Sequence, residues 1–171
     1  GFFLGLPYQG LTFDLALHLG TLLAVVAYFC KDLWRLARAG LAIRSLRELD
    51  TTQRLGLGIA LSTIPAAIVG ASMPDAFTES LRTPVLIAVN LIVFGVLLGL
   101  ADRHGGGRRG EGAITLRDAL TIGAAQALAL IPGTSRSGIT MTAGLALGLD
   151  RATAARYSFL MSVPITALAV G

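Results

Sequence analysis

Charged side chains are scarce in this sequence. Only 14% of its 171 residues are Asp, Glu, Lys or Arg, against about a quarter in typical soluble domains. Hydrophobic residues make up 54% of the chain, and the mean hydropathy is +0.72. So few charges cannot cover a soluble globule of this size, and the composition therefore excludes an ordinary cytosolic enzyme and a disordered tail.

Several kinds of motif are also missing. The single cysteine, Cys30, cannot form an internal disulfide, which excludes a disulfide scaffold. There is no Ser-His-Asp order, no metal-ligand cluster and no Walker-type phosphate loop. The net charge of +4 could suggest nucleic acid, but the basic residues lie between apolar runs without an accompanying aromatic or glycine-rich motif. Basic loops between apolar runs indicate a membrane protein instead.

Long apolar runs predict an all-α, polytopic integral membrane protein. A membrane-spanning helix needs about 20 apolar residues. The expected spans are residues 12–30, 55–73, 83–101 and 157–171, all within one membrane domain that covers the whole sequence. The sequence does not begin with Met, and its last apolar run stops at Gly171. We therefore expect a fragment that lacks sequence at both ends.

Residues 118–149 form a broken apolar segment. Two uncharged stretches of 13 residues, Ala119–Ile131 and Ser137–Leu149, flank Pro132-Gly133. A helix of that length measures about 20 Å, which is too short for a hydrocarbon core of about 30 Å. Irregular backbone at membrane depth is tolerated only against protein or a water-filled cavity. The pattern therefore predicts a re-entrant helix hairpin beside a cavity.

The basic residues predict the orientation. Six of them lie in the expected loop from Lys31 to Arg54, four follow the third span, and Arg82 stands alone in the loop Pro74–Arg82. Arg151 and Arg156 follow the hairpin. Positively charged loops stay in the cytoplasm. We therefore expect Pro74–Arg82 on the outer face and the other loops inside.

Arg136 is the only basic residue between Ala119 and Leu149, and no acidic residue lies in that stretch. A charge at membrane depth costs at least about 2.5 kcal/mol, so such residues are functional by default. Hydroxyl groups, glycines and a helix N-terminus surround it, which is a favourable setting for phosphate. The neighbours in question are Gly133, Thr134, Ser135, Ser137, Gly138 and Thr140. Together they predict an anion site.

Structural explanations compete with this one. Ser137 could simply cap a helix. Arg136 could reach the membrane interface or pair with Asp14 or Asp118. His18 could face the cavity or pack within the protein, and Gln126 could bind ligand or the hairpin backbone, of which we expect the backbone. A simple helix cap, however, needs no buried arginine.

Three segments resemble one family. Gln126–Thr140, which reads QALALIPGTSRSGIT, is similar to the second signature of the undecaprenyl-diphosphate phosphatase family, the bacitracin-resistance membrane phosphatases. Thr12–Trp34 resembles the segment that follows that family's first signature, and Ala154–Pro164 the stretch after the second. The resemblance covers essentially the whole chain.

The resemblance implies an enzyme of the bacterial plasma membrane that converts undecaprenyl diphosphate to undecaprenyl phosphate for peptidoglycan synthesis. It implies inverted repeats, each with a re-entrant hairpin, and a divalent cation, magnesium or calcium. Arg136, Ser135 and Ser137 would act catalytically and, with Thr134, hold the diphosphate; Gly133, Gly138, Thr140 and Gln126 would complete the substrate site. The expected partners are the polyprenyl diphosphate lipid and membrane lipid, with no nucleic acid. Whether the protein forms a homodimer is left open by the sequence.

The family's first signature, with its glutamates, serine and histidine, is expected upstream of Gly1, together with the cation ligands. The chain alone is therefore expected to be inactive. The main alternative function is a transporter or lipid-phosphate translocase, because broken helices with anion-facing N-termini also occur in transporters. A structural membrane subunit is the third hypothesis, and an unpaired Arg136 argues against it.

Overall fold

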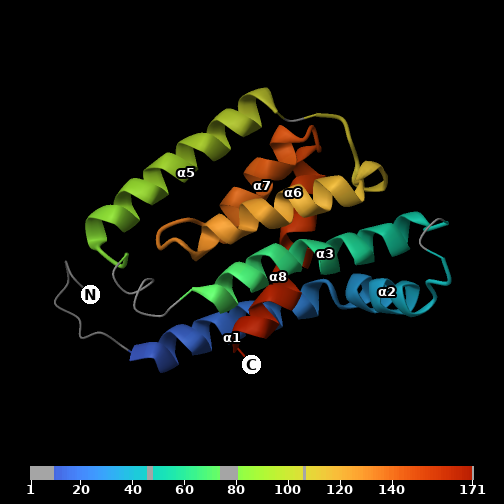
Figure 1. Ribbon diagram of the computed structural model, residues 1–171, viewed down its shortest axis with the longest axis horizontal. Helices are drawn as coiled ribbons and strands as arrows, with labels where there is room; N and C mark the ends of the chain where they lie inside the picture. Colours follow the sequence, from blue (N-terminus) through green and yellow to red (C-terminus); the bar gives the residue numbers. More distant parts are fainter. Residues whose placement is uncertain (1–9, 46–47, 74–80, 106, 171) are drawn as a thin grey trace.

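The computed structural model describes residues 10–45, 48–73, 81–105 and 107–170, with side chains from residue 16 to residue 168. Within these ranges the regular secondary structure is helical apart from one isolated bridge between Arg109 and Leu149, so the expected all-α fold is confirmed (Figure 1). The helices are α1 (Gly10–Tyr28), α2 (Cys30–Leu41), α3 (Thr51–Ser72), α5 (Pro84–His104), α6 (Leu116–Ala127), α7 (Arg136–Ala146) and α8 (Arg151–Val170), with short 3-10 helices η1 (Glu111–Ala113) and η2 (Leu128–Leu130).

Two described helices, α3 and α5, are long and apolar enough to cross a membrane. Each begins at a capping residue. Asp50 and Gln53 form a capping box before α3, and the Thr83 hydroxyl accepts from the backbone N–H of Leu86 ahead of α5, where Pro84 occupies the first helical position. The chain is thus a membrane protein with at least two candidate spans. The span expected at 157–171 stays a prediction.

The α1–α2 pair is bent by 77° at Phe29 and makes a third candidate span if it is counted as one. The expectation of a loop directly after residue 30 is wrong, because α2 is helical to Leu41. Its sequence is amphipathic: Leu33 and Leu36 contact the core while Trp34 stays exposed. The charges that suggested a loop lie on the outward face of this helix.

The broken segment forms a hairpin. The first arm is α6 followed by η2, the second is α7, and the two arms are joined by residues 131–135. Gly133 has φ +88°, a conformation that suits glycine at a sharp turn. At the open end, the Arg109 guanidinium bonds both the Asp118 carboxylate at the start of α6 (2.6 Å) and the Leu147 carbonyl at the end of α7 (2.7 Å). The two ends of the hairpin therefore lie together, as a re-entrant segment requires.

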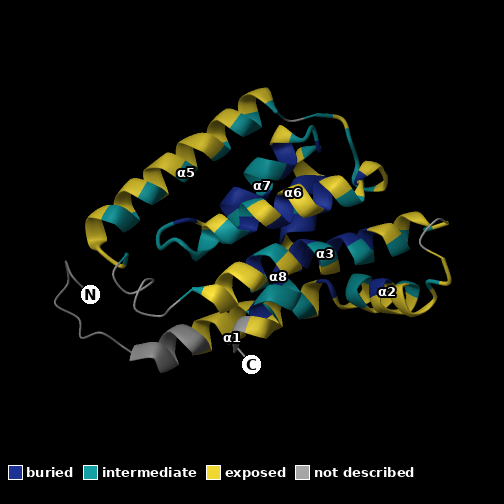
Figure 2. Cartoon of the chain, in the orientation of Figure 1, coloured by how far each residue is buried: buried dark blue, intermediate teal, exposed yellow. Residues whose placement is uncertain are grey.

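Helix α8 passes through the middle of the molecule and packs against α1, α3 and α7. Its residues Tyr157, Leu160 and Met161 are almost fully buried, together with Ala119 and Ile122 of α6. By contrast, α5 has no buried residue (Figure 2). The core therefore lies between α3, α6, α7 and α8, and it fixes the hairpin that carries the expected site.

Candidate anion-binding site

The N-terminus of α7 lies at the tip of the hairpin. The Ser135 hydroxyl caps the helix by accepting from the backbone N–H of Gly138 (3.2 Å), so the cap is Ser135 and not Ser137. The N–H groups of Arg136 and Ser137 fall in the first turn, where no intrahelical acceptor exists. These two N–H groups and the positive end of the helix dipole favour an anion.

Arg136 reaches across to α8. Its Nη1 donates to the hydroxyl of Thr166 (2.6 Å) and, at 3.5 Å, to the carbonyl of Ser162. No acidic side chain among the described residues pairs with Arg136. Asp118, one of the two suggested partners, is paired with Arg109 instead, and the side chain of Asp14, the other, lies outside the described part. The guanidinium is thus oriented by neutral oxygens, and its charge is not compensated within the described chain.

A cavity of about 700 Å³ opens beside Arg136. Its walls come from α1, α3, α6, the hairpin tip and α8, together with Arg82 just before α5. The residues that line it are His18, Thr21, Val25, Ala66, Arg82, Gln126, Ala129, Leu130, Pro132, Thr134, Arg136, Ser137, Ser158, Phe159, Ser162, Ile165 and Thr166. Polar and basic groups therefore gather in a cavity with an otherwise apolar wall.

Two buried polar side chains in this wall have no hydrogen-bond partner among the described residues. Gln126 is 2% exposed and neither its Oε1 nor its Nε2 is bonded, and the hydroxyl of Thr134, 8% exposed, is also unbonded. The expectation that Gln126 satisfies the hairpin backbone is therefore wrong. Buried polar groups are nearly always paired, and exceptions concentrate at functional sites. Both side chains are available to a ligand.

The other expected site residues support the cavity without lining it. Thr140 is buried, and its hydroxyl lies 2.7 Å from the hydroxyl of Ser158, which joins α7 to α8. A Cβ at Gly138 would lie 3.1 Å from that of Ser135, and one at Gly133 would lie 2.6 Å from the carbonyl oxygen of Ile87. Because Gly138 has no side chain, the Ser135 hydroxyl can cap the helix, and because Gly133 has none, the hairpin tip can approach α5.

Several residues that line the cavity were not among those expected from the sequence. Ser158, Ser162 and Thr166 are spaced four residues apart on α8, so they lie on one face of that helix. This stripe of hydroxyls in an apolar helix was a signal that could have identified them. Arg82 and Thr21 carried no comparable signal. His18, for which two roles were open, lines the cavity.

The described residues do not form a metal site. No group of three or more His, Cys, Asp or Glu side chains among them could hold an ion, and no described residue of the cavity wall is acidic. Magnesium and calcium prefer carboxylate and other oxygen ligands. The part of the chain that the structure describes therefore fits an anion and does not by itself fit a divalent cation.

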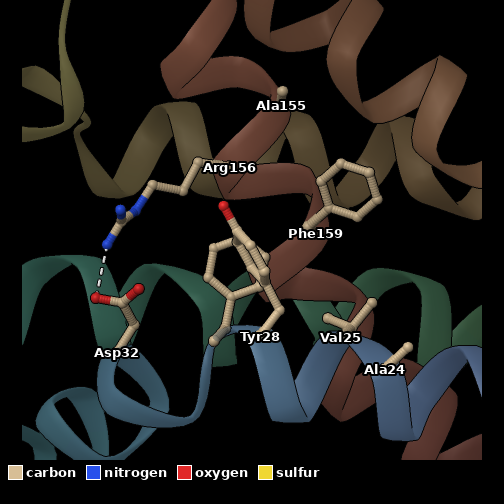
Figure 3. A pocket seen from close by; sticks show the side chains of 8 residues that line it. Ala24, Val25, Tyr28, Asp32, Ala155, Arg156 and Phe159 are labelled. Carbon is tan, nitrogen blue, oxygen red and sulfur yellow. Dashed lines mark ion pairs between the residues drawn. The ribbon is translucent and has the colours of Figure 1, made fainter.

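A second cavity, of about 660 Å³, lies beside the first, and Val25 and Phe159 line both. Figure 3 shows Arg156 at its edge, paired with Asp32 (2.7 Å). Arg156 also pairs with Glu111 (2.9 Å). Its charge is thus compensated, unlike that of Arg136, and this second cavity lacks the character of an anion site.

Comparison with known proteins identifies relatives. The sequence profile of the family described as "Bacitracin resistance protein BacA" matches residues 2–171. The chain is 50% identical over 163 residues to an undecaprenyl-diphosphatase of Nitrosococcus oceani, a match that covers 95% of this chain and 62% of that protein. It is 51% identical to one of Hahella chejuensis (94% and 60%) and 52% identical to one of Pelobacter propionicus (96% and 61%). The chain thus spans about three fifths of the length of these relatives.

Proposed function

Because this chain belongs to the bacitracin resistance protein BacA family, we propose that its cavity at Arg136 is the phosphate-binding part of an undecaprenyl-diphosphate phosphatase. The observation that carries the proposal is that three incompletely paired polar residues line one cavity. Arg136 pairs with no acidic side chain of the described ranges, and Gln126 and Thr134 are buried and unbonded there. Relatives about half identical to this chain are named undecaprenyl-diphosphatase, which supplies the substrate class.

Arg136 has the central role in this proposal. Thr166 and Ser162 engage only Nη1 of its guanidinium, which leaves N–H groups on Nη2 and Nε for two parallel bonds to phosphate oxygens. Ser137, Thr134 and the first N–H groups of α7 would donate to the same anion. Within the cavity these donors would stabilise the negative charge that grows on the phosphate oxygens as the bond to phosphorus breaks.

Hydrolysis also needs an attacking group and proton transfer. The described wall holds hydroxyls and His18 but no carboxylate, so its contribution to the reaction is to bind and orient the phosphate. A divalent cation, which the family resemblance implies, would help neutralise the diphosphate. Its ligands are not among the described residues of the cavity.

The proposed setting is the bacterial plasma membrane, with the lipid carrier of peptidoglycan precursors as substrate. The hairpin tip lies at the same end as the start of α5, because the Asn90 side chain donates to the Pro132 carbonyl (2.8 Å). By the positive-inside argument that end faces outward. The cavity would then receive a diphosphate head group from the outer leaflet while the prenyl chain stays in lipid.

Phosphate release from undecaprenyl diphosphate by the purified full-length protein in detergent tests the proposal. The same preparation, reconstituted into vesicles, is examined for movement of the unhydrolysed lipid between leaflets. Release of one phosphate per lipid supports the phosphatase. Lipid movement without release would contradict it and favour the translocase.

A further inference from the structure

Arg82 is a second arginine in the wall of the cavity, and neither the resemblance nor the motif assigns it a role. It lies between α3 and α5, far from the hairpin in sequence. Its side chain is exposed, and it makes no hydrogen bond or ion pair with another residue of the described ranges. A free guanidinium that lines an anion cavity is available to the anion.

The backbone at this position is anchored. Thr83 is extended (φ −83°, ψ 138°), its hydroxyl accepts from the N–H of Leu86 (3.4 Å), and Pro84 follows at the first position of α5. A residue before proline is restricted to extended conformations. Arg82 therefore directly precedes backbone that is fixed at the start of α5.

The start of α5 is in turn docked on the hairpin tip (Figure 1). Asn90 donates to the carbonyl of Pro132, and the backbone of Gly133 approaches that of Ile87 so closely that a Cβ would lie 2.6 Å from the Ile87 oxygen. Arg136 follows three residues after Gly133. The two arginines therefore approach one cavity from two elements that are fixed to each other.

We propose that Arg82 binds the phosphate group of the diphosphate that Arg136 does not hold, and so makes the cavity prefer a diphosphate over a monophosphate. The inference rests on the proposed function. Two cations without a described acidic neighbour match an anion with more than one negative charge. A monophosphate can satisfy only one of two guanidiniums that approach from separate elements, whereas a diphosphate can bridge them.

This arrangement also favours turnover. Cleavage of the diphosphate leaves two separate monophosphates, each of which has lost one of the two charge contacts. Both products then bind more weakly than the substrate, which promotes their release. Arg82 thus serves specificity and release, while Arg136 faces the hydroxyls and the helix N-terminus.

The test compares Arg82→Gln and Arg82→Lys with wild type in the full-length protein. Arg103→Gln is the matched control, because Arg103 is exposed at the other end of α5 and does not line the cavity. The readouts are KM and kcat for undecaprenyl diphosphate, and calorimetric binding of inorganic pyrophosphate and of orthophosphate. Monodisperse elution checks folding.

We expect Arg82→Gln to raise KM and to weaken pyrophosphate binding by about tenfold or more, with orthophosphate binding changed by less than about twofold. Arg82→Lys keeps the charge and should recover part of this loss, and Arg103→Gln should resemble wild type. Unchanged pyrophosphate binding by a folded Arg82→Gln protein would overturn the inference, as would equal weakening of both anions. Wild-type protein that releases no phosphate contradicts the proposed function instead, and the titrations alone then decide the role of Arg82.

Discussion

At the scale of single residues, Gln126 combines burial with an unbonded amide, which a purely structural side chain at that position would avoid. An unsatisfied buried polar group costs about 1–3 kcal/mol. Thr134, which lines the same cavity, carries a comparable cost. Both side chains are held in place by packing before any ligand arrives. Such preorganised donors stabilise charge without rearrangement at the moment of reaction.

Replacing Gln126 tests whether its unbonded amide lowers stability and contributes to activity. Gln126→Met keeps a similar volume but removes the unpaired amide, so we expect the ligand-free protein to melt at an equal or higher temperature. Catalytic activity should fall about tenfold, because a donor to the anion is lost. Thermal unfolding in detergent and phosphate release measure the two effects. A clear loss of stability together with full activity would show that the amide is structural.

Local sequence was sufficient to identify the residues around Arg136. The charge, the hydroxyls and the glycines all lie within Gly133–Thr140, and the structure gathers Thr134, Arg136 and Ser137 at one cavity. The capping role of Ser135 and the bracing role of Thr140 needed coordinates. The hydroxyl stripe of α8 was visible in the sequence, but which helix it meets was not. Arg82 carried no such signal, because its relation to Arg136 depends on how distant helices pack.

At the scale of helices and hairpins, the approach of α6 to α3 decides where the hairpin sits. At Gly123 a Cβ would lie 2.6 Å from the Cα of Ser62, so the two backbones are in direct contact. Small residues permit such close packing between helices in membranes. The position of Gln126, one turn further along α6, depends on this contact.

Gly123→Ala should therefore push α6 away from α3. Overpacking of this kind costs about 1–3 kcal/mol, and we expect a lower melting temperature together with reduced phosphate release. Gly20→Ala is the matched control, because a Cβ at Gly20 meets nothing within 4 Å and alanine is at least as good a helix former. Equal melting temperatures for the two variants would contradict the close contact.

The hairpin was predictable because Pro132-Gly133 interrupts an apolar stretch, and the break between η2 and α7 falls at that point. Helix α2 was not predicted because its charges are typical of a loop, although the spacing of Leu33 and Leu36 fits an amphipathic helix. The 77° bend before it depends on tertiary packing around Phe29 and could not be inferred from local pattern.

At the scale of the whole molecule, charged contacts gather at one end. Arg109 bonds the hairpin ends, Arg151 pairs with Asp102 at the end of α5 (2.9 Å), and Arg156 pairs with Asp32 and Glu111. The hairpin tip and the start of α5 form the opposite end. The basic end should face the cytoplasm. Residues 74–80 of the expected outer loop lie outside the described residues, whereas Leu81 and Arg82 are described.

This orientation is tested with single cysteines at Glu48 and at Leu81, each in a Cys30→Ala background. An impermeant thiol reagent added to intact cells should label Leu81→Cys strongly and Glu48→Cys only after lysis. The lysed samples control for reactivity. Labelling of Glu48→Cys alone in intact cells would invert the topology and place the cavity at the cytoplasmic side.

Arg136 offers the most direct test of the central claim that this fold builds a diphosphate site at the hairpin tip. The measurement is phosphate release from undecaprenyl diphosphate by purified, monodisperse full-length Arg136→Ala protein, with Arg136→Lys alongside. Losing the guanidinium removes transition-state stabilisation, so the rate for Arg136→Ala should fall on the order of a hundredfold or more. Arg136→Lys keeps the charge but loses the fork, and should also be severely impaired. Near-normal phosphate release by folded Arg136→Ala protein would contradict the anion site.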